Sequence, residues 1–275
     1  MYNFSVNFPA ILSALTDLIY PPSCICCGKE IAGEDLVATD HATGGSRKIG
    51  SPASHKPASF CQECAAALQE LVDTPTCSRC SAPVGEGGSC PRCRGRGLFP
   101  FERIVALAPF RPPLRSLVHH IKFHHRWPLA EVLADQLLHH EPAAELLERT
   151  DVLVAIPLHW SRQIVRGYNQ AAAVAQQLSR RTGLPVVVAL RRIENTQPQT
   201  NLHSRQARQL NVRRAFGLNR GNGIRGKRVT LIDDVTTTGA TLHAAAVTLG
   251  KLEPSSISAL VLAIADPRRR DFQLV

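Results

Sequence analysis

The chain has 275 residues, of which 44% are hydrophobic, enough for one mid-sized domain and a second small one. This composition excludes a wholly disordered protein, and no run approaches the roughly 20 consecutive apolar residues that a membrane-spanning helix needs. The net charge is +10, concentrated between Val152 and Ile232, where fourteen lysines and arginines accompany one acidic residue, Glu194. We expect this stretch either to attract polyanions or to form a solvated basic face.

The N-terminal segment, Met1 to Tyr20, has apolar residues at helical spacing. It contains no lysine or arginine and no small-residue cleavage site, so it does not have the pattern of a signal peptide. We expect a helix that docks on the body of the protein or, alternatively, contacts a membrane surface or a partner. The lack of an export signal predicts a cytoplasmic protein whose cysteines are not in disulfides.

Eight of the nine cysteines fall into four Cys-x-x-Cys pairs: Cys24 and Cys27, Cys61 and Cys64, Cys77 and Cys80, Cys90 and Cys93. Four thiolates make one closed tetrahedral zinc site, so the pairs predict two structural zinc ions. The simplest grouping takes the first two pairs together and the last two together, while an interleaved grouping and a redox role stay open. Cys26 is left over, and we expect it not to be a ligand.

The composition and hydrophobic periodicity of the sequence change near Leu98, which divides the chain into two parts. Residues 1–98 have little periodicity and too few aliphatic side chains for a core of their own, so we predict an N-terminal helix and a double zinc-ribbon domain there. Residues 34–59, rich in Gly, Ser, Ala, Pro and His, are expected to be a flexible insertion. Residues 99–275 are predicted to form the larger domain.

In this larger part, short apolar runs alternate with helical patterns. Strands are predicted at residues 101–110, 151–157, 185–190, 228–232 and 257–264, and helices at 114–123, 129–140, 169–181 and 240–249. Continuously apolar strands are typical of a sheet that is buried on both faces. Strands that alternate with helices predict an α/β fold, with a parallel sheet and flanking helices.

The strongest functional signal runs from Val229 to Leu242. A buried strand is followed by two carboxylates, Asp233 and Asp234, which can accept hydrogen bonds from a vicinal diol such as that of ribose. The turn that follows opens a helix, where backbone N–H groups, threonine hydroxyls and a glycine without a side chain can cradle a phosphate. The turn consists of Val235, Thr236, Thr237, Thr238, Gly239, Ala240 and Thr241.

This segment resembles the motif with which type I phosphoribosyltransferases bind 5-phosphoribosyl-1-pyrophosphate (PRPP). Other segments are similar to the ComF family of competence-associated proteins, and this resemblance spans almost the whole chain except residues 34–59. They are Tyr20 to Cys24, Ile121 to Phe123, Ile156 to Arg162, Arg166 to Gln170 and Thr196 to Leu202 with Asn211, Val212, Ala215 and Phe216 beyond it. The resemblance implies a type I phosphoribosyltransferase-like sheet preceded by a small zinc-ribbon domain.

The resemblance also assigns roles to residues. It places a pyrophosphate loop at Pro157, Leu158, His159, Trp160 and Arg162, and a mobile, polyanion-contacting loop at Arg166, Gln199, Arg205 and Arg208. His159 either hydrogen-bonds near the pyrophosphate or donates a proton. Lys122 is either a ligand of the pyrophosphate or of a second substrate, or a surface lysine. With Asp233 and Asp234 it completes the set of candidate catalytic residues.

Three functions remain open. The first is a ComF-like protein that binds PRPP and single-stranded DNA in DNA uptake or utilisation, with other DNA-uptake proteins as possible partners. The second is a nucleobase phosphoribosyltransferase, disfavoured because Thr237 stands where some purine-salvage enzymes have a carboxylate that handles the base. The third is a non-catalytic, PRPP-responsive module. Phosphoribosyl transfer passes through a cation-like sugar and a magnesium-bound leaving group, so a magnesium ion is expected with PRPP.

Overall fold

The computed structural model describes residues 23–31, 36–37, 60–84, 90, 92–94, 98–123, 129–158, 164, 167–193, 215–219 and 223–265. The predicted N-terminal helix and most of the predicted insertion lie outside these residues. None of the helices in the described part of the chain has the length and apolar character needed to span a membrane.

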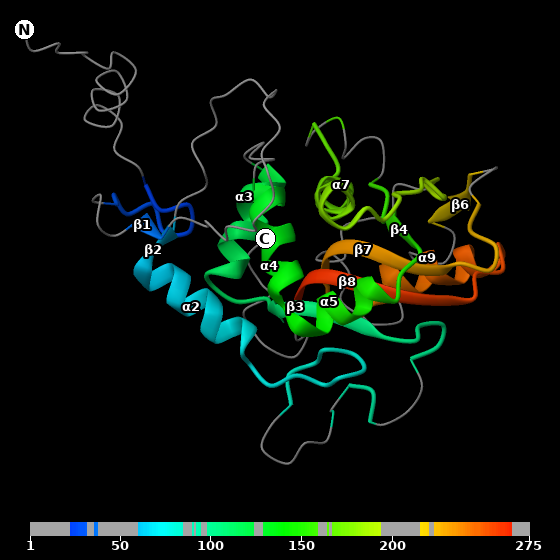
Figure 1. Cartoon of the computed structure of the whole chain (residues 1–275), viewed down its shortest axis with the longest axis horizontal. Helices are drawn as coiled ribbons and strands as arrows, with labels where there is room; N and C mark the ends of the chain where they lie inside the picture. The colour runs from blue at the N-terminus through cyan, green and yellow to red at the C-terminus, as the bar shows by residue number, and fades with distance from the viewer. Residues whose placement is uncertain are drawn as a thin grey trace, which may run out of the picture.

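A four-stranded parallel sheet forms the centre of the molecule (Figure 1). Its order is β3-β8-β7-β4, with bounds Ile104–Pro109, Ser256–Ile264, Arg228–Thr236 and Val152–Ala155. The two longest strands, β7 and β8, have nine residues each and occupy the middle. The predicted parallel α/β architecture is therefore confirmed.

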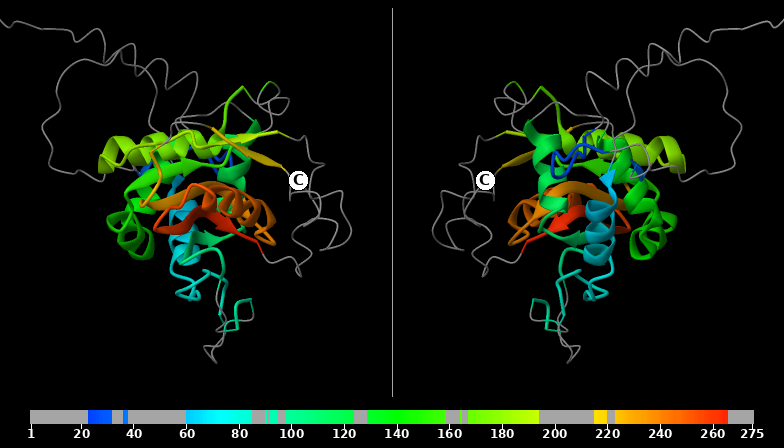
Figure 2. Two further views of the ribbon diagram at one scale, coloured as in Figure 1. Left: turned by 90° about the vertical axis from the view of Figure 1, so that its right-hand side faces the viewer. Right: turned by 90° about the vertical axis from the view of Figure 1, so that its left-hand side faces the viewer.

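Helices cover both faces of this sheet. Alternate strand residues point to different cores: Leu153, Ile232 and Leu260 belong to one, and Val154, Leu231 and Val261 to the other. Figure 2 shows α9, drawn in orange, on the opposite side of the strands from the green helices α4 and α5. The first core contains α3 (Leu114–Phe123), α4 (Leu129–His139), α5 (Glu141–Glu148) and α7 (Gln170–Thr182), and the second contains α9 (Ala240–Gly250).

The Cys-rich part also has its own short elements. Strands β1 (Leu36–Val37) and β2 (Phe60–Cys61) pair antiparallel, and α2 (Gln62–Val72) follows directly. The sequence did not predict α2, because the helix begins within the second cysteine pair, with Cys61 as its N-cap and Cys64 in its first turn. It also missed the eight-residue α5, which directly follows α4.

The prediction of a buried strand at residues 185–190 is wrong. The segment makes only a single bridge to the edge strand β4, through Leu153 and Val186, and Val188 is 74% exposed. The chain then leaves the main sheet, and β5 (Leu190–Arg192) pairs antiparallel with β6 (Phe216–Leu218). The backbone bonds of residues 185–190 to β4 all involve Leu153, which donates to Pro185 and accepts from Val187, while Ala189 already bonds to Asn219 beyond β6.

Each half of the Cys-rich part shares a core with the larger part. Ile25, Phe60 and Leu68 join the core of α3 and α4, whereas Cys80 and Cys90 are buried in the core of α9. These contacts supply the apolar surroundings that residues 1–98 are too poor in aliphatic side chains to make alone.

The second half is also hydrogen-bonded to edge strand β3. The Ile104 backbone N–H donates to the Arg79 carbonyl at 2.9 Å. The Ser81 hydroxyl donates to the Ile104 carbonyl at 3.1 Å and accepts from the Ala106 N–H at 3.0 Å. Because Ser81 is 5% exposed, these bonds fix this part of the chain to the sheet away from water.

Candidate functional site

The two carboxylates lie at the carboxyl end of the central strand β7. The strand is longer than the sequence predicted: it continues through Thr236, and Asp233 still pairs with Val261 of β8. After the turn, α9 begins at Ala240, with Gly239 as its N-cap at φ 78°. Ligands of open parallel sheets bind beyond the carboxyl ends of the strands, so the carboxylates and the turn share the position that favours a site.

Lys122 reaches this position from α3. Its Nζ lies 3.0 Å from Oδ2 of Asp234, and the two side chains are only 16% and 17% exposed. The other carboxylate oxygen of Asp234 accepts the N–H of Val235 at 2.6 Å, and the Asp234 N–H donates to Asp233 Oδ1 at 2.9 Å. The structure therefore brings together all three predicted catalytic residues, and the alternative of a surface lysine does not fit.

The neighbourhood raises the pKa of Asp233 to about 7. Burial is the largest cause, and the charge of Asp234 adds to it; the N–H of Asp234 and the charges of Lys122 and Arg192 act in the opposite direction. A carboxyl group with this pKa is partly protonated near neutral pH. It can accept a hydrogen bond from a hydroxyl in one state and donate one in the other.

Tyr168 and Asn169 connect the elements around this site. In the sequence, they were noted only as part of the family resemblance. The Tyr168 hydroxyl donates a hydrogen bond to the carbonyl of Ile121, next to Lys122, and burial raises the pKa of Tyr168 to about 12. Asn169 caps α7 through the Ala172 N–H and donates from Nδ2 to the Ile156 carbonyl at 2.9 Å. This short segment thereby connects α3, α7 and the end of β4.

Arg192, which the sequence did not single out, also faces the site. Its charge lowers the pKa of Asp233 against the effect of burial, and its guanidinium lies 5.5 Å from the ring centre of Phe216. It stands on β5, outside every motif in the sequence. Strand β5 pairs with β6 beside the main sheet, so the effect of Arg192 on Asp233 is a product of the tertiary fold.

The remaining predicted ligand residues are placed only in part. Pro157 and Leu158 follow β4 at the same edge of the sheet, since Ala155 pairs with Ile232 of β7. The Thr238 hydroxyl accepts the Ala240 N–H at 3.3 Å at the start of α9. Seven predicted residues lie outside the described part of the chain: His159, Trp160, Arg162, Arg166, Gln199, Arg205 and Arg208.

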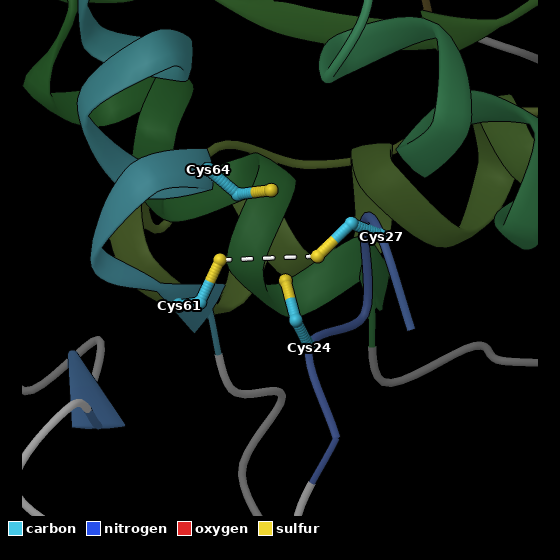
Figure 3. Close-up of side chains that lie close together, drawn as sticks. All are labelled: Cys24, Cys27, Cys61 and Cys64. Atoms are coloured by element: carbon cyan, nitrogen blue, oxygen red, sulfur yellow. Dashed lines mark hydrogen bonds between the residues drawn. The ribbon is translucent and has the colours of Figure 1, made fainter. Parts of the chain in front are cut away.

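The eight paired cysteines form two separate clusters. Figure 3 shows the first, in which the four thiols point toward one another. Cys61 comes from β2, Cys64 from α2, and Cys24 and Cys27 from a turn earlier in the chain. Within each cluster the sulfurs lie within 4.8 Å of one another, and the grouping follows the order of the pairs: Cys24, Cys27, Cys61, Cys64 and Cys77, Cys80, Cys90, Cys93. Of the two groupings that the sequence left open, this is the simpler one.

Both clusters fit a zinc ion. Four sulfurs at about 2.3 Å from a tetrahedral metal lie about 3.8 Å apart. The Sγ–Sγ separations are 3.8 Å for Cys27 and Cys61, and 3.7 Å for Cys77 and Cys93. Cys26 is not among the four sulfurs of the first cluster. Burial is the main reason that its pKa rises to about 12.

One cysteine in each cluster is disposed to ionise. Burial raises the pKa of Cys90, but hydrogen bonds from the backbone N–H groups of Cys93 and Arg92 outweigh it and lower the pKa to about 6. The same balance lowers the pKa of Cys24 to about 6, with donors that include the N–H groups of Cys61 and Cys27. Thiolates are the ligands that zinc takes, and N–H donors around them are consistent with structural metal sites.

Comparison with known proteins agrees with this architecture. Residues 165–273 match the family model "Phosphoribosyl transferase domain", so the larger part is a phosphoribosyltransferase-type domain. DNA utilization protein YhgH of Salmonella typhi is 32% identical over 66% of this chain and 80% of its own. Competence protein F of Haemophilus influenzae is 29% identical over 74% of this chain and 90% of its own. Competence protein ComFC of Bacillus subtilis is 36% identical over 40% of this chain and 43% of its own.

The chain therefore belongs to the ComF family of competence and DNA-utilisation proteins. It combines a phosphoribosyltransferase-type domain with an N-terminal part that carries two four-cysteine clusters.

Proposed function

We propose that this protein binds PRPP at the carboxyl end of β7. The observation that carries the proposal is the succession of Asp233, Asp234 and the left-handed Gly239 between the central strand and α9. In the proposed complex the two carboxylates bind the ribose 2′- and 3′-hydroxyls. The 5′-phosphate lies in the turn at the N-terminus of α9, where backbone N–H groups and the helix dipole favour an anion.

The pyrophosphate of PRPP lies toward Pro157 and Leu158, which stand at the same sheet edge, and Lys122 provides a cation on this side. A magnesium ion bound with PRPP would neutralise part of the pyrophosphate charge and make it a better leaving group. Lys122 orients Asp234 through their ion pair, and Tyr168 holds the end of α3 that carries Lys122. These residues position the sugar for a loss of pyrophosphate that needs no protein nucleophile.

The favoured role is in DNA use, with single-stranded DNA as a second ligand. The names of the relatives support it, as does the basic stretch from Val152 to Ile232. Not all of this charge is available, because Arg181, Arg225 and Arg228 form ion pairs with carboxylates. A hollow between α4 and α7 adds an aromatic and a cationic group, Tyr168 and Arg180, of the kind that single strands contact.

The alternative is a nucleobase phosphoribosyltransferase of nucleotide salvage. Thr237 offers a hydroxyl where a carboxylate would serve to move a proton of the base, and two cysteine clusters are no requirement for a small-molecule enzyme. A non-catalytic module that responds to PRPP would use the same site without turnover. Pyrophosphate release measured with PRPP and a panel of bases and oligonucleotides separates these alternatives.

The test of the PRPP site is the double variant Asp233→Asn with Asp234→Asn, measured by calorimetry with PRPP and magnesium. We expect the wild type to bind and the double variant to lose binding while it keeps its zinc content. A matched control is Glu148→Gln, which removes an exposed carboxylate from α5 and should leave binding unchanged. Equal affinity of the double variant and the wild type would refute the site.

The DNA proposal is tested separately, by fluorescence anisotropy with a labelled single-stranded oligonucleotide at increasing salt. Because phosphate contacts release counterions, the logarithm of the affinity should fall linearly with the logarithm of salt concentration. Arg180→Gln should weaken binding and reduce that slope by about one unit. Affinity that does not change with salt, or no binding at low salt, would eliminate single-stranded DNA as an electrostatic ligand.

A further inference from the structure

The second cysteine cluster lies against residues 237–239, the turn between β7 and α9 in which we place the phosphate and which we call the phosphate turn. Arg92 stands in the tight turn between two ligands of that cluster, Cys90 and Cys93. A β-carbon built on Gly239 would lie 3.1 Å from Nη2 of Arg92 and 3.9 Å from the hydroxyl oxygen of Thr236. The Arg92 guanidinium is thus packed onto the backbone of the turn that precedes α9, although the two residues are far apart in the sequence.

This contact places a positive charge where a helix already has one. The N-terminus of α9 carries the positive end of the helix dipole, so an anion bound there would interact favourably with both the dipole and the guanidinium. Arginine presents several N–H donors in a planar fork that matches phosphate oxygens. The pairing of Arg92 with the start of α9 is therefore suited to hold a phosphate from two sides.

The fold fixes the position of Arg92. On either side of it, Cys90 accepts the Cys93 N–H at its sulfur at 3.4 Å and the Arg94 N–H at its carbonyl at 3.0 Å, which closes the short turn. Cys90 and Cys93 are buried in the same core as Ala240 and Leu242 of α9, and the neighbouring Ser81 is hydrogen-bonded to β3. The cysteine cluster and the phosphate turn are therefore parts of one packed unit.

Gly239 completes the arrangement. Its φ of 78° is unfavourable for other residues, and a side chain there would press on the Arg92 guanidinium at 3.1 Å. A glycine at this position satisfies both the left-handed backbone and the close approach of the arginine.

We propose that Arg92 binds the 5′-phosphate of the phosphoribosyl ligand, and that the second cysteine cluster is consequently a wall of this site. This inference rests on the proposed binding of PRPP and adds a residue to it. The metal of the second cluster then has a role in ligand affinity, because it holds the turn that carries Arg92. The first cluster packs against the core of α3 and α4 and has no such role.

The experiment compares Arg92→Gln with Arg94→Gln, which changes an exposed arginine one residue beyond the same cysteine. Affinities for PRPP, ribose 5-phosphate and inorganic pyrophosphate are measured by calorimetry, and zinc is counted in each protein. We expect Arg92→Gln to bind PRPP and ribose 5-phosphate about 10- to 100-fold more weakly, the loss typical of a charge-assisted hydrogen bond. Its affinity for pyrophosphate and its zinc content should be those of the wild type, and Arg94→Gln should match the wild type throughout.

The outcomes separate this inference from the proposed function. A wild-type protein that binds neither PRPP nor ribose 5-phosphate contradicts both. A wild type that binds them and an Arg92→Gln variant that binds them equally well overturns only the role of Arg92. If Arg92→Gln loses zinc, Arg92→Lys decides the question: with zinc retained, it should recover most of the ribose 5-phosphate affinity because it keeps the charge. A zinc-loaded lysine variant that binds no better than the glutamine variant also overturns the role.

Discussion

The ammonium group of Lys122 lies 3.0 Å from the carboxylate of Asp234, across the gap between α3 and the end of β7. The ion pair gives Asp234 a cationic partner, while the adjacent Asp233 sits with its pKa raised to about 7. Two neighbouring carboxylates in one site thus have different electrostatic surroundings. A diol ligand would then meet one carboxylate held by a lysine and another that can carry a proton at neutral pH.

The Lys122–Asp234 pair should contribute measurably to stability. In a double-mutant cycle of Lys122→Met and Asp234→Asn, we expect a coupling energy of about 1–2 kcal/mol, since the pair is largely shielded from water. The control is the exposed pair of Arg225 and Glu253, with side chains 82% and 66% exposed. Its cycle, made with glutamine at both positions, should give below about 0.5 kcal/mol. Denaturant unfolding measures both, and equal values would mean that burial of the first pair has no effect.

The raised pKa of Asp233 predicts a pH dependence of stability. The folded-state pKa is about 7 against an ordinary 3.8, so the unfolded chain loses this proton at lower pH than the folded protein does. The contribution of Asp233 is fully present below pH 3.8 and is lost as the pH rises to about 7. Asp233→Asn cannot ionise, so its Tm should rise relative to wild type between pH 5 and pH 8, by several degrees.

Thermal unfolding of wild type, Asp233→Asn and the exposed control Glu148→Gln at pH 5, 6, 7 and 8 checks this prediction. Glu148→Gln should not show a growing difference from wild type over this range. A difference between Asp233→Asn and wild type that stays constant, or shrinks with rising pH, would contradict the raised pKa.

The sequence predicted the framework of the site because local chemistry determines it. Val229 to Leu242 combines an apolar run, two acids and a glycine, and each part marks a strand, a ligand group or a turn without reference to the rest of the chain. Helix α3 begins and ends where the sequence predicted, because the prolines before it and its apolar spacing are local signals. The sequence also predicted the two four-cysteine clusters, because metal-binding motifs require fixed spacing.

The contacts that give the site its electrostatics could not be predicted in this way. Lys122, Arg192 and Arg92 come from α3, β5 and a cysteine turn, and they meet Asp233, Asp234 and Gly239 only through tertiary packing. No spacing rule connects these segments. The strand predicted at residues 185–190 failed for a related reason: its valines favour a strand, but its place at the sheet edge is a property of the whole fold.

Gly239 should tolerate no side chain. In Gly239→Ala the φ of 78° costs about 1 kcal/mol, and the new methyl group presses on Arg92 at 3.1 Å. We expect a lower Tm and at least about tenfold weaker binding of ribose 5-phosphate, since the arginine has to move. Gly250→Ala is the control on the same helix, because nothing lies within 4 Å of a β-carbon there. It should leave stability and binding close to wild type, and an equal effect of both variants would argue against a special role of Gly239.

The two cysteine clusters should differ in their effect on ligand binding. The wild type should hold two zinc ions per chain, and Cys61→Ser and Cys80→Ser should each reduce this to one, because each removes one ligand of one closed site. Cys26→Ser removes a thiol that is not in either cluster and should retain both ions. Elemental analysis of the purified proteins measures the zinc content.

Ligand affinity then separates the clusters. Cys80→Ser should weaken binding of ribose 5-phosphate, because the cluster that it disrupts carries Arg92 beside Gly239. Cys61→Ser should bind it as the wild type does, because the first cluster packs against the opposite core of the sheet, with α3 and α4. Comparable losses in both variants would indicate general destabilisation. A loss confined to Cys80→Ser would show that zinc binding at the second cluster supports the phosphate turn. That zinc ion would then contribute to ligand affinity as well as to the fold.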